Sequence, residues 1–167
     1  PAIEVTEWNR FTSDLLAADQ SPPVQVRGMA IVQIAVHDAL NAIEARYASY
    51  AYAGSAPNAS IAAAVAAATR DTLVQVLPSA TPSIDAAYAA KLSSIAGGPA
   101  KDAGIATGRA AAEAILARRS ADDLPAAIGK PHTPAAAAPG VYQLTPPLNI
   151  VIGAGMGDLQ PFAISSA

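Results

Sequence analysis

The spacing of apolar positions predicts five consecutive helices, and the longest covers residues 22–50. Its apolar side chains recur at three- and four-residue steps, which places them on one face of a helix of about 25 residues. They are Val26, Met29, Val36, Leu40, Ile43 and Tyr47. Gln33 is the one polar member of this stripe. Because alanines fill much of the other faces, we expect this helix to run through a bundle and not to lie on a surface.

The other four predicted helices cover residues 5–18, 60–77, 81–96 and 99–119. Pro78 and Pro99 mark two of the boundaries, and Ser60 and Thr81 are suitable N-cap residues. The connections are short, so neighbouring helices are expected to pack antiparallel. The positions predicted to face the core are Trp8, Phe11 and Leu15; Ile61, Val65, Ala68, Leu73 and Val76; Ile84, Tyr88, Leu92 and Ile95; and Ile105, Ala112, Ile115 and Leu116.

The pattern changes after residue 124, where prolines become frequent. Seven prolines between Pro125 and Pro161 prevent any long helix. Many apolar side chains remain, so the segment is expected to be an extended strap that lies over the bundle. A short strand over residues 149–152 is an open alternative. The predicted fold is therefore all-α: an antiparallel bundle over residues 1–124, with a proline-rich segment, 125–167, packed on it in the same domain.

Composition narrows the class of protein. Hydrophobic residues make up 52% of the 167 and charged residues 14%, which is enough to build a core. The formal net charge is −3 and no basic run occurs, so a nucleic-acid surface is not expected. No segment reaches the ~20 apolar residues that span a bilayer. The absence of cysteine excludes disulfides and thiol catalysis. A removed secretory signal and a shortened recombinant chain both explain the start at Pro1.

His37 and Asp38 are the first candidates for chemistry. Adjacent helical residues point about 100° apart, so they do not grip one atom from the same face. A metal site needs three or four ligands, and the other histidine, His132, lies in the proline-rich segment. We therefore interpret the pair as hydrogen-bonding to a neighbouring helix within an apolar setting. A functional role for the pair is the alternative.

Three further patterns have simple structural explanations. The acidic side chains Glu4, Glu7, Asp14 and Asp19 fit a solvated helix face. Residues 153–157 alternate glycine with other residues but lack the lysine and Ser/Thr of a phosphate loop, so a turn is predicted. Residues 58–60 match a glycosylation sequon, and Ser60 as a helix cap accounts for its serine.

Several runs together resemble a known family. They are EWNRF, SPPVQVRGMAIVQIAVHDALNAIEARYASY, AAAVAAATRDTLVQVLP, IDAAYAAKLSSIAGGPAKDAGIATGRAAAEAILARRSADD, PGVYQLTPP and LQPFAISS. In this order they are similar to the N-terminal half of bacterial proteins related to vanadium-dependent chloroperoxidase, in the type 2 phosphatidic acid phosphatase superfamily. The resemblance spans essentially the whole chain. It implies two packed helical bundles in a secreted or periplasmic protein, with the chemistry in the second bundle.

The resemblance also implies which sequence motifs would carry out that chemistry. Lys-x6-Arg-Pro, Pro-Ser-Gly-His and Ser-Arg-x6-His segments surround a phosphate or vanadate in the family, where cationic side chains neutralise the oxyanion. The last two segments are absent here, and Lys91 is followed by Gly98-Pro99 where the first requires Arg-Pro. No catalytic, cofactor-binding or metal-binding residue is therefore predicted, and the oxyanion is expected only in a catalytic half that this chain lacks.

Three functional hypotheses follow. The first is a non-catalytic scaffold domain of a haloperoxidase-like or phosphatase-like protein, whose partner is the absent catalytic bundle or a second copy. The second, from a different class, is a free-standing secreted bundle that binds a partner or a small apolar ligand. The third is an altered enzyme that uses His37 and Asp38.

Overall fold

The computed structural model describes residues 2–19 and 21–164, and over these residues all regular structure is helical. The α-helices are α1 (Ala2–Asp19), α2 (Pro22–Ile43), α3 (Ile61–Val76), α4 (Thr81–Ser93), α5 (Pro99–Arg118) and α6 (Leu124–Gly129). Two 3-10 helices, η1 (Pro78–Ala80) and η2 (Met156–Asp158), complete the set. The all-α prediction is confirmed, and in this described part residues 149–152 form no strand. The chain divides into two compact units, Pro1–Arg118 and Arg119–Ala167.

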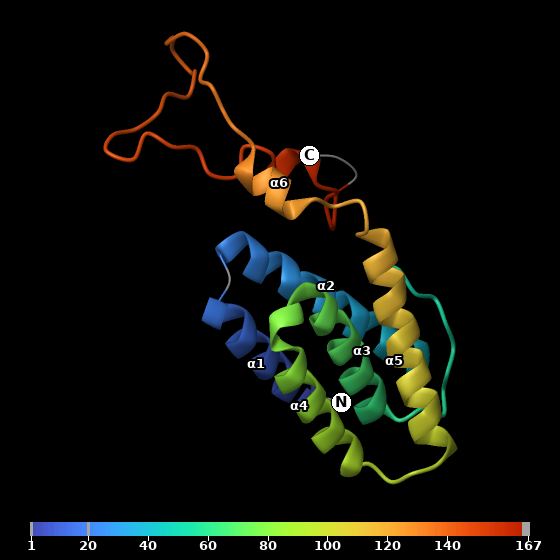
Figure 1. Ribbon diagram of the computed structural model, residues 1–167. Helices are drawn as coiled ribbons and strands as arrows, with labels where there is room; N and C mark the ends of the chain where they lie inside the picture. The colour runs from blue at the N-terminus through green and yellow to red at the C-terminus, as the bar shows by residue number, and fades with distance from the viewer. Residues whose placement is uncertain (1, 20, 165–167) are drawn as a thin grey trace. The chain divides into compact units, whose positions relative to one another are not determined.

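Helix α3 lies at the centre of the first unit. It contacts α1, α2, α4 and α5, which surround it in Figure 1. Residues 63–69 are all buried, so this alanine-rich helix has no exposed face along two turns. Helix α2 contacts α1, α3 and α5 and has ten buried residues, so it runs through the bundle as expected. The small side chains of α3 let four helices approach it closely, which makes it the central element.

The closest approach to α3 is made by α5 through two glycines one turn apart. A Cβ atom on Gly104 would lie 2.5 Å from the Ser60 carbonyl oxygen, and one on Gly108 would lie 2.3 Å from the Ala64 carbonyl oxygen. Such separations are far inside van der Waals contact, so only glycine fits at this spacing of the helices. Ala112 and Ile115 are buried as predicted, whereas Ile105 and Leu116 are half-buried.

Helix α2 is shorter than predicted, and its buried face matches the predicted one only in part. It ends at Ile43, where the Glu44 N–H still donates to the Leu40 carbonyl at 2.8 Å. Val26 and Tyr47, both placed in the core by the sequence pattern, are each 72% exposed, so that prediction is wrong. Val36 and Ile43 are buried as predicted, and the other buried apolar side chains of α2 are Ile31, Val32, Ala35, Ala39 and Ala42. Gln33 donates a hydrogen bond to the Asn9 side chain of α1.

Of the two predicted N-cap residues, Ser60 is confirmed and Thr81 is not. The Ser60 hydroxyl accepts the Ala63 N–H at 3.3 Å and caps α3, as predicted. Thr81 does not cap α4. It is the first helical residue after η1, and its hydroxyl donates to the Pro78 carbonyl at 2.7 Å. On α1, Trp8 is buried and meets Phe11 edge-on at a ring-centroid distance of 5.5 Å.

In the second unit, the segments 119–130 and 155–162 contact each other and form the base of a long loop. We call these two segments the stem. Arg119 is 3% exposed, stacks over the Phe162 ring at 3.6 Å and donates to the Gln160 and Pro161 carbonyls. The Gly155 N–H donates to the Ala127 carbonyl of α6 at 3.0 Å. Between these stem segments, residues 131–154 contain no helix and extend away from α6 (Figure 1). The sequence pattern did not predict α6, and the packing of this region on the bundle stays a prediction.

Candidate functional site

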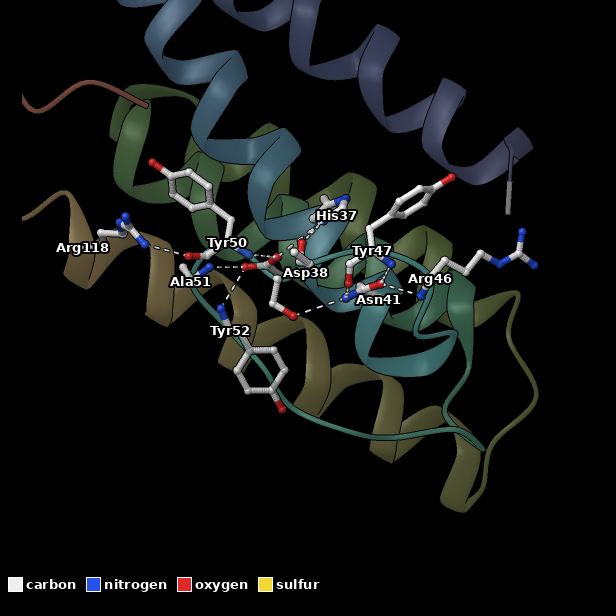
Figure 2. Close-up of polar contacts among 11 residues, drawn as sticks. His37, Asp38, Asn41, Arg46, Tyr47, Tyr50, Ala51, Tyr52 and Arg118 are labelled. Carbon is white, nitrogen blue, oxygen red and sulfur yellow. Dashed lines mark hydrogen bonds and ion pairs between the residues drawn. The ribbon is translucent and has the colours of Figure 1, made fainter. Parts of the chain in front are cut away.

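A cluster of polar side chains on α2 forms hydrogen bonds with the backbone of the segment that follows this helix. Asp38 is fully buried, and its carboxylate accepts the backbone N–H groups of Tyr50, Ala51 and Tyr52 at 2.8, 2.7 and 2.8 Å (Figure 2). Three N–H donors compensate a carboxylate for the water that burial removes. Asp38 therefore fixes the path of residues 50–52, and we call this arrangement the Asp38 clamp.

Asn41, one turn further along α2, holds the preceding stretch of the same segment. Its amide oxygen accepts the N–H groups of Arg46 and Tyr47, each at 2.9 Å. Its amide nitrogen donates to the Tyr47 carbonyl at 2.7 Å and to the Ser49 hydroxyl at 3.3 Å. Short Asp and Asn side chains compete with helix hydrogen bonds by offering acceptors to nearby backbone groups. This competition explains why the chain leaves the helix after Ile43.

His37 lies at the edge of this cluster. Its side chain is 39% exposed, and Nε2 lies 3.2 Å from the Ala48 carbonyl and 3.9 Å from Oδ1 of Asp38. Both oxygens of Asp38 already accept backbone donors, so the carboxylate is not arranged to orient His37 as a general base. Hydrogen bonding by the pair was predicted correctly, but the partner is the segment after α2 and not a neighbouring helix.

Arg118 joins α5 to the same segment. Its Nη1 donates to the Tyr50 carbonyl at 2.7 Å, and its guanidinium lies 4.4 Å from the centroid of the Tyr50 ring. The Tyr50 N–H donates in turn to Asp38. Backbone groups of one residue thus connect the ends of α2 and α5, as Figure 2 shows. The sequence pattern did not predict this connection.

A small cavity of about 210 Å³ lies beside the clamp. Its lining residues are His37, Leu40, Asn41, Glu44, Arg46, Tyr47 and Ile61. The polar groups of Asn41 already bond to the backbone, and Glu44 and Arg46 pair with each other at 2.7 Å, so His37 and the exposed Tyr47 ring are the other side chains of the lining that could contact a ligand through a ring. Pockets for drug-sized ligands measure about 300–1,000 Å³. This one suits a fragment no larger than a single ring.

Lys91, the residue that resembles the start of a family oxyanion segment, lies in a shallow groove beside α1. Its ammonium pairs with the Glu7 carboxylate at 3.1 Å. The groove of about 340 Å³ is also lined by Trp8 and Phe11. Glu7 and Asp14 are exposed, in agreement with the predicted solvated face, whereas Glu4 is half-buried. The Asp19 side chain is outside the described residues.

A second polar cluster joins α3, α4 and α5. Arg70 donates from Nε to Asp85 and from Nη1 to Asp71, both at 2.8 Å, and Arg109 lies 3.5 Å from Asp71. The hydrogen bonds to Asp85 and then Asp71 raise the pKa of Arg70. Burial, followed by the charge of Asp71, raises the pKa of Tyr88 above its usual 10.0. Folding therefore favours the neutral phenol of Tyr88. This contribution to the free energy of unfolding is fully present below the ordinary pKa of tyrosine, and it is lost as pH rises through the raised pKa of Tyr88.

We expect Arg70→Met to lower the free energy of unfolding by about 1 kcal/mol, because it removes two ion pairs that are only partly screened by solvent. Chemical denaturation monitored by circular dichroism measures the change. Arg46→Met is the matched control. It breaks the 2.7 Å pair with Glu44, but the Arg46 side chain is 70% exposed. An equal loss in both variants would contradict a special role for the Arg70 cluster.

The remaining candidate residues from the sequence analysis do not belong to a cluster of functional side chains. His132 is exposed, with its ring centroid 6.1 Å from that of Tyr142. Gly153–Gly157 includes a turn that leads into η2, as predicted, and Asn58 lies in an exposed turn. Across residues 2–19 and 21–164, no three His, Cys, Asp or Glu side chains gather to hold a metal ion. None of the helices described is both long and apolar enough to cross a membrane.

Comparison of the chain with protein-family models, with curated proteins and with solved structures gives no match.

Proposed function

We propose that this chain is a non-catalytic helical scaffold domain of a secreted or periplasmic protein related to vanadium-dependent haloperoxidases and type 2 phosphatidic acid phosphatases. The observation that supports it most is the Asp38 clamp. Asp38 is the acidic residue of the His-Asp-Ala run on which the resemblance partly rests, and both its oxygens accept backbone N–H groups. A carboxylate used in this way maintains the path of the backbone, and His37 Nε2, at 3.9 Å from Oδ1, lies beyond hydrogen-bond distance.

Other runs that carry the resemblance also have packing roles. Trp8 of the EWNRF run is buried, and Pro22-Pro23 opens α2 where a missing N–H does no harm. In the proposed protein, phosphate or vanadate is bound by lysine and arginine side chains of a second helical bundle. The present chain supports that bundle and supplies no ligand to the oxyanion.

The proposal is tested by measuring turnover. We expect no hydrolysis of p-nitrophenyl phosphate above the protein-free rate. We also expect no bromination of monochlorodimedone with bromide, hydrogen peroxide and vanadate. His37→Ala and His132→Ala should leave both readings at background, because, among the residues that the structure describes, neither imidazole has a carboxylate within hydrogen-bond distance to support acid–base catalysis. A rate in the original chain that disappears in either variant would refute the non-catalytic assignment and favour the altered enzyme.

The link to a larger protein has a separate test. The intact mass of the natural gene product, purified from its source cells, is expected to exceed the 16.7 kDa of this chain. The additional sequence should contain the Pro-Ser-Gly-His and Ser-Arg-x6-His segments. A natural product of 16.7 kDa would contradict the scaffold proposal and leave the independent binding module as the better explanation.

The cavity beside the clamp favours that second candidate function, a bundle that binds a small apolar ligand. Its volume of about 210 Å³ and its exposed Tyr47 ring fit a single-ring compound. Titration with indole, followed by NMR, distinguishes the two. Shifts confined to His37, Leu40 and Tyr47 would favour ligand binding, whereas unchanged spectra are expected for a scaffold.

A further inference from the structure

Helix α4 is the least buried α-helix of the first unit. Of its residues, all of which the structure describes, Ile84 alone is buried. In α3, by contrast, residues 63–69 are buried without a break. The free energy of opening an element depends largely on the apolar contacts that the opening removes. Opening of α4 should therefore cost less than unfolding of the whole bundle.

Two ion pairs connect α4 to other helices. Arg70 of α3 donates from Nε to the Asp85 carboxylate of α4 at 2.8 Å. The Lys91 ammonium of α4 pairs with the Glu7 carboxylate of α1 at 3.1 Å. These four side chains are between 23% and 59% exposed, so dissolved salt can screen both pairs. The attachment of α4 is therefore expected to depend on ionic strength more than the packing of α3 does.

The chain at the end of α4 is built to allow movement. Gly97 and Gly98 follow this helix, and a Cβ atom on either would have no heavy atom within 4 Å. Gly98 has a φ angle of 133°, a conformation that favours glycine. Lys101 of α5 donates to the Leu92 and Ile95 carbonyls at 2.6 and 3.3 Å, on the far side of the two glycines. The glycines can thus act as a hinge, and a third charged group holds it in the observed position.

We propose that α4 is a hinged lid, which opens as a unit while α1, α2, α3 and α5 stay packed together. Those four helices contact one another directly, and α4 packs mainly on α3 at the outside of the bundle (Figure 1). Trp8 and Phe11 of α1 line the groove of about 340 Å³ that Lys91 of α4 also lines. Opening of the lid breaks the Lys91–Glu7 pair and widens this groove. This inference goes beyond the scaffold function and does not depend on it.

Hydrogen exchange of the full chain, followed by NMR at single amides, tests the proposal. After correction for intrinsic exchange rates, the hydrogen-bonded amides of α4 should exchange together, about tenfold or more faster than those of residues 63–69. About 1 M sodium chloride should speed exchange in α4 about threefold, because it screens the two ion pairs. Arg70→Met should have a similar effect, because it removes the pair with Asp85. The salt effect should be smaller in this variant than in the original chain.

Two matched variants separate opening of the lid from unfolding of the bundle. Ile115→Val shortens a fully buried side chain of α5 and should speed exchange at residues 63–69 about threefold. It should leave the α4 amides unchanged, because α3 and α5 stay packed when the lid opens. Arg46→Met removes an exposed ion pair with Glu44, outside α4, and should also leave α4 exchange unchanged. Circular dichroism should show the same helix content in all variants.

Three outcomes would overturn the inference. The first is exchange in α4 as slow as at residues 63–69. The second is acceleration of both regions by the same factor in Ile115→Val, which would mean that α4 opens only when the whole bundle unfolds. The third is α4 exchange that neither salt nor Arg70→Met changes, which would show that the ion pairs do not hold the lid.

Discussion

Asp38→Ala is expected to lower the free energy of unfolding by about 3 kcal/mol, the largest effect of any single change considered for this chain. Three charge-assisted hydrogen bonds disappear together, and the N–H groups of Tyr50, Ala51 and Tyr52 lose their shared acceptor. Solvent compensates them only in part, since these three residues are partly buried. Urea denaturation measures the global loss, and hydrogen exchange should show the amides of residues 50–52 opening first.

Two variants sharpen this experiment. Asp14→Ala removes an exposed carboxylate of α1 and should change the stability by less than about 0.5 kcal/mol. Asp38→Asn retains one acceptor oxygen but turns an NH₂ group toward backbone donors, so an intermediate loss is expected. Slow exchange at residues 50–52 that persists in Asp38→Ala would show that the clamp does not determine the path of this segment.

Gly108→Ala is expected to destabilise the chain by about 2 kcal/mol, although alanine favours a helix more than glycine does. The new Cβ would lie 2.3 Å from the Ala64 carbonyl oxygen and 2.8 Å from the Ala67 Cβ. The first of these atoms belongs to the backbone, so no side-chain rotation relieves the contact and α5 must move away from α3. Thermal and urea denaturation measure the loss.

Gly129→Ala is the control for this substitution. Gly129 is the last residue of α6, and a Cβ there would have no heavy atom within 4 Å. Its stability should stay within about 0.5 kcal/mol of the original chain. If Gly108→Ala were as stable as Gly129→Ala, the close approach of α3 and α5 would not be a requirement of the fold.

Local signals in the sequence predicted most helix ends because the chemistry that ends a helix is itself local. Ser60 caps α3, and Pro99 opens α5. The same reasoning missed α6, since Pro125 was interpreted only as a residue that prevents helices. Asp123 accepts the Ala126 N–H at 3.0 Å and places the proline in the first turn, where it is tolerated.

Periodicity was misleading where small side chains decide the packing. The stripe that includes Val26 and Tyr47 contains large apolar groups and predicted that both side chains face the core, yet both are exposed. Alanines contribute little to such a pattern, although Ala63, Ala64 and Ala67 occupy the most crowded part of the core. Which helix becomes central depends on how closely neighbours can approach it, a property of pairs of helices that one stripe does not contain.

The sequence predicted that Asp38 needs hydrogen-bond donors, but it did not predict which groups supply them. Asp38 in an apolar helix required hydrogen-bond donors, and it has them. Its donors lie 12 to 14 residues further along, in a segment that the periodic pattern assigned partly to the helix itself. Nothing in the spacing of polar residues indicates that a backbone turn, and not a neighbouring side chain, satisfies the carboxylate.

The central position of α3 has a consequence for the order in which the chain folds during synthesis. Helices α1 and α2 leave the ribosome first, but their common partner, α3, follows only after residue 60. The small-residue face of α3 is then uncovered until the glycines of α5 emerge about forty residues later. The bundle of α1 to α5 therefore stays incomplete until residues 99–118 are available.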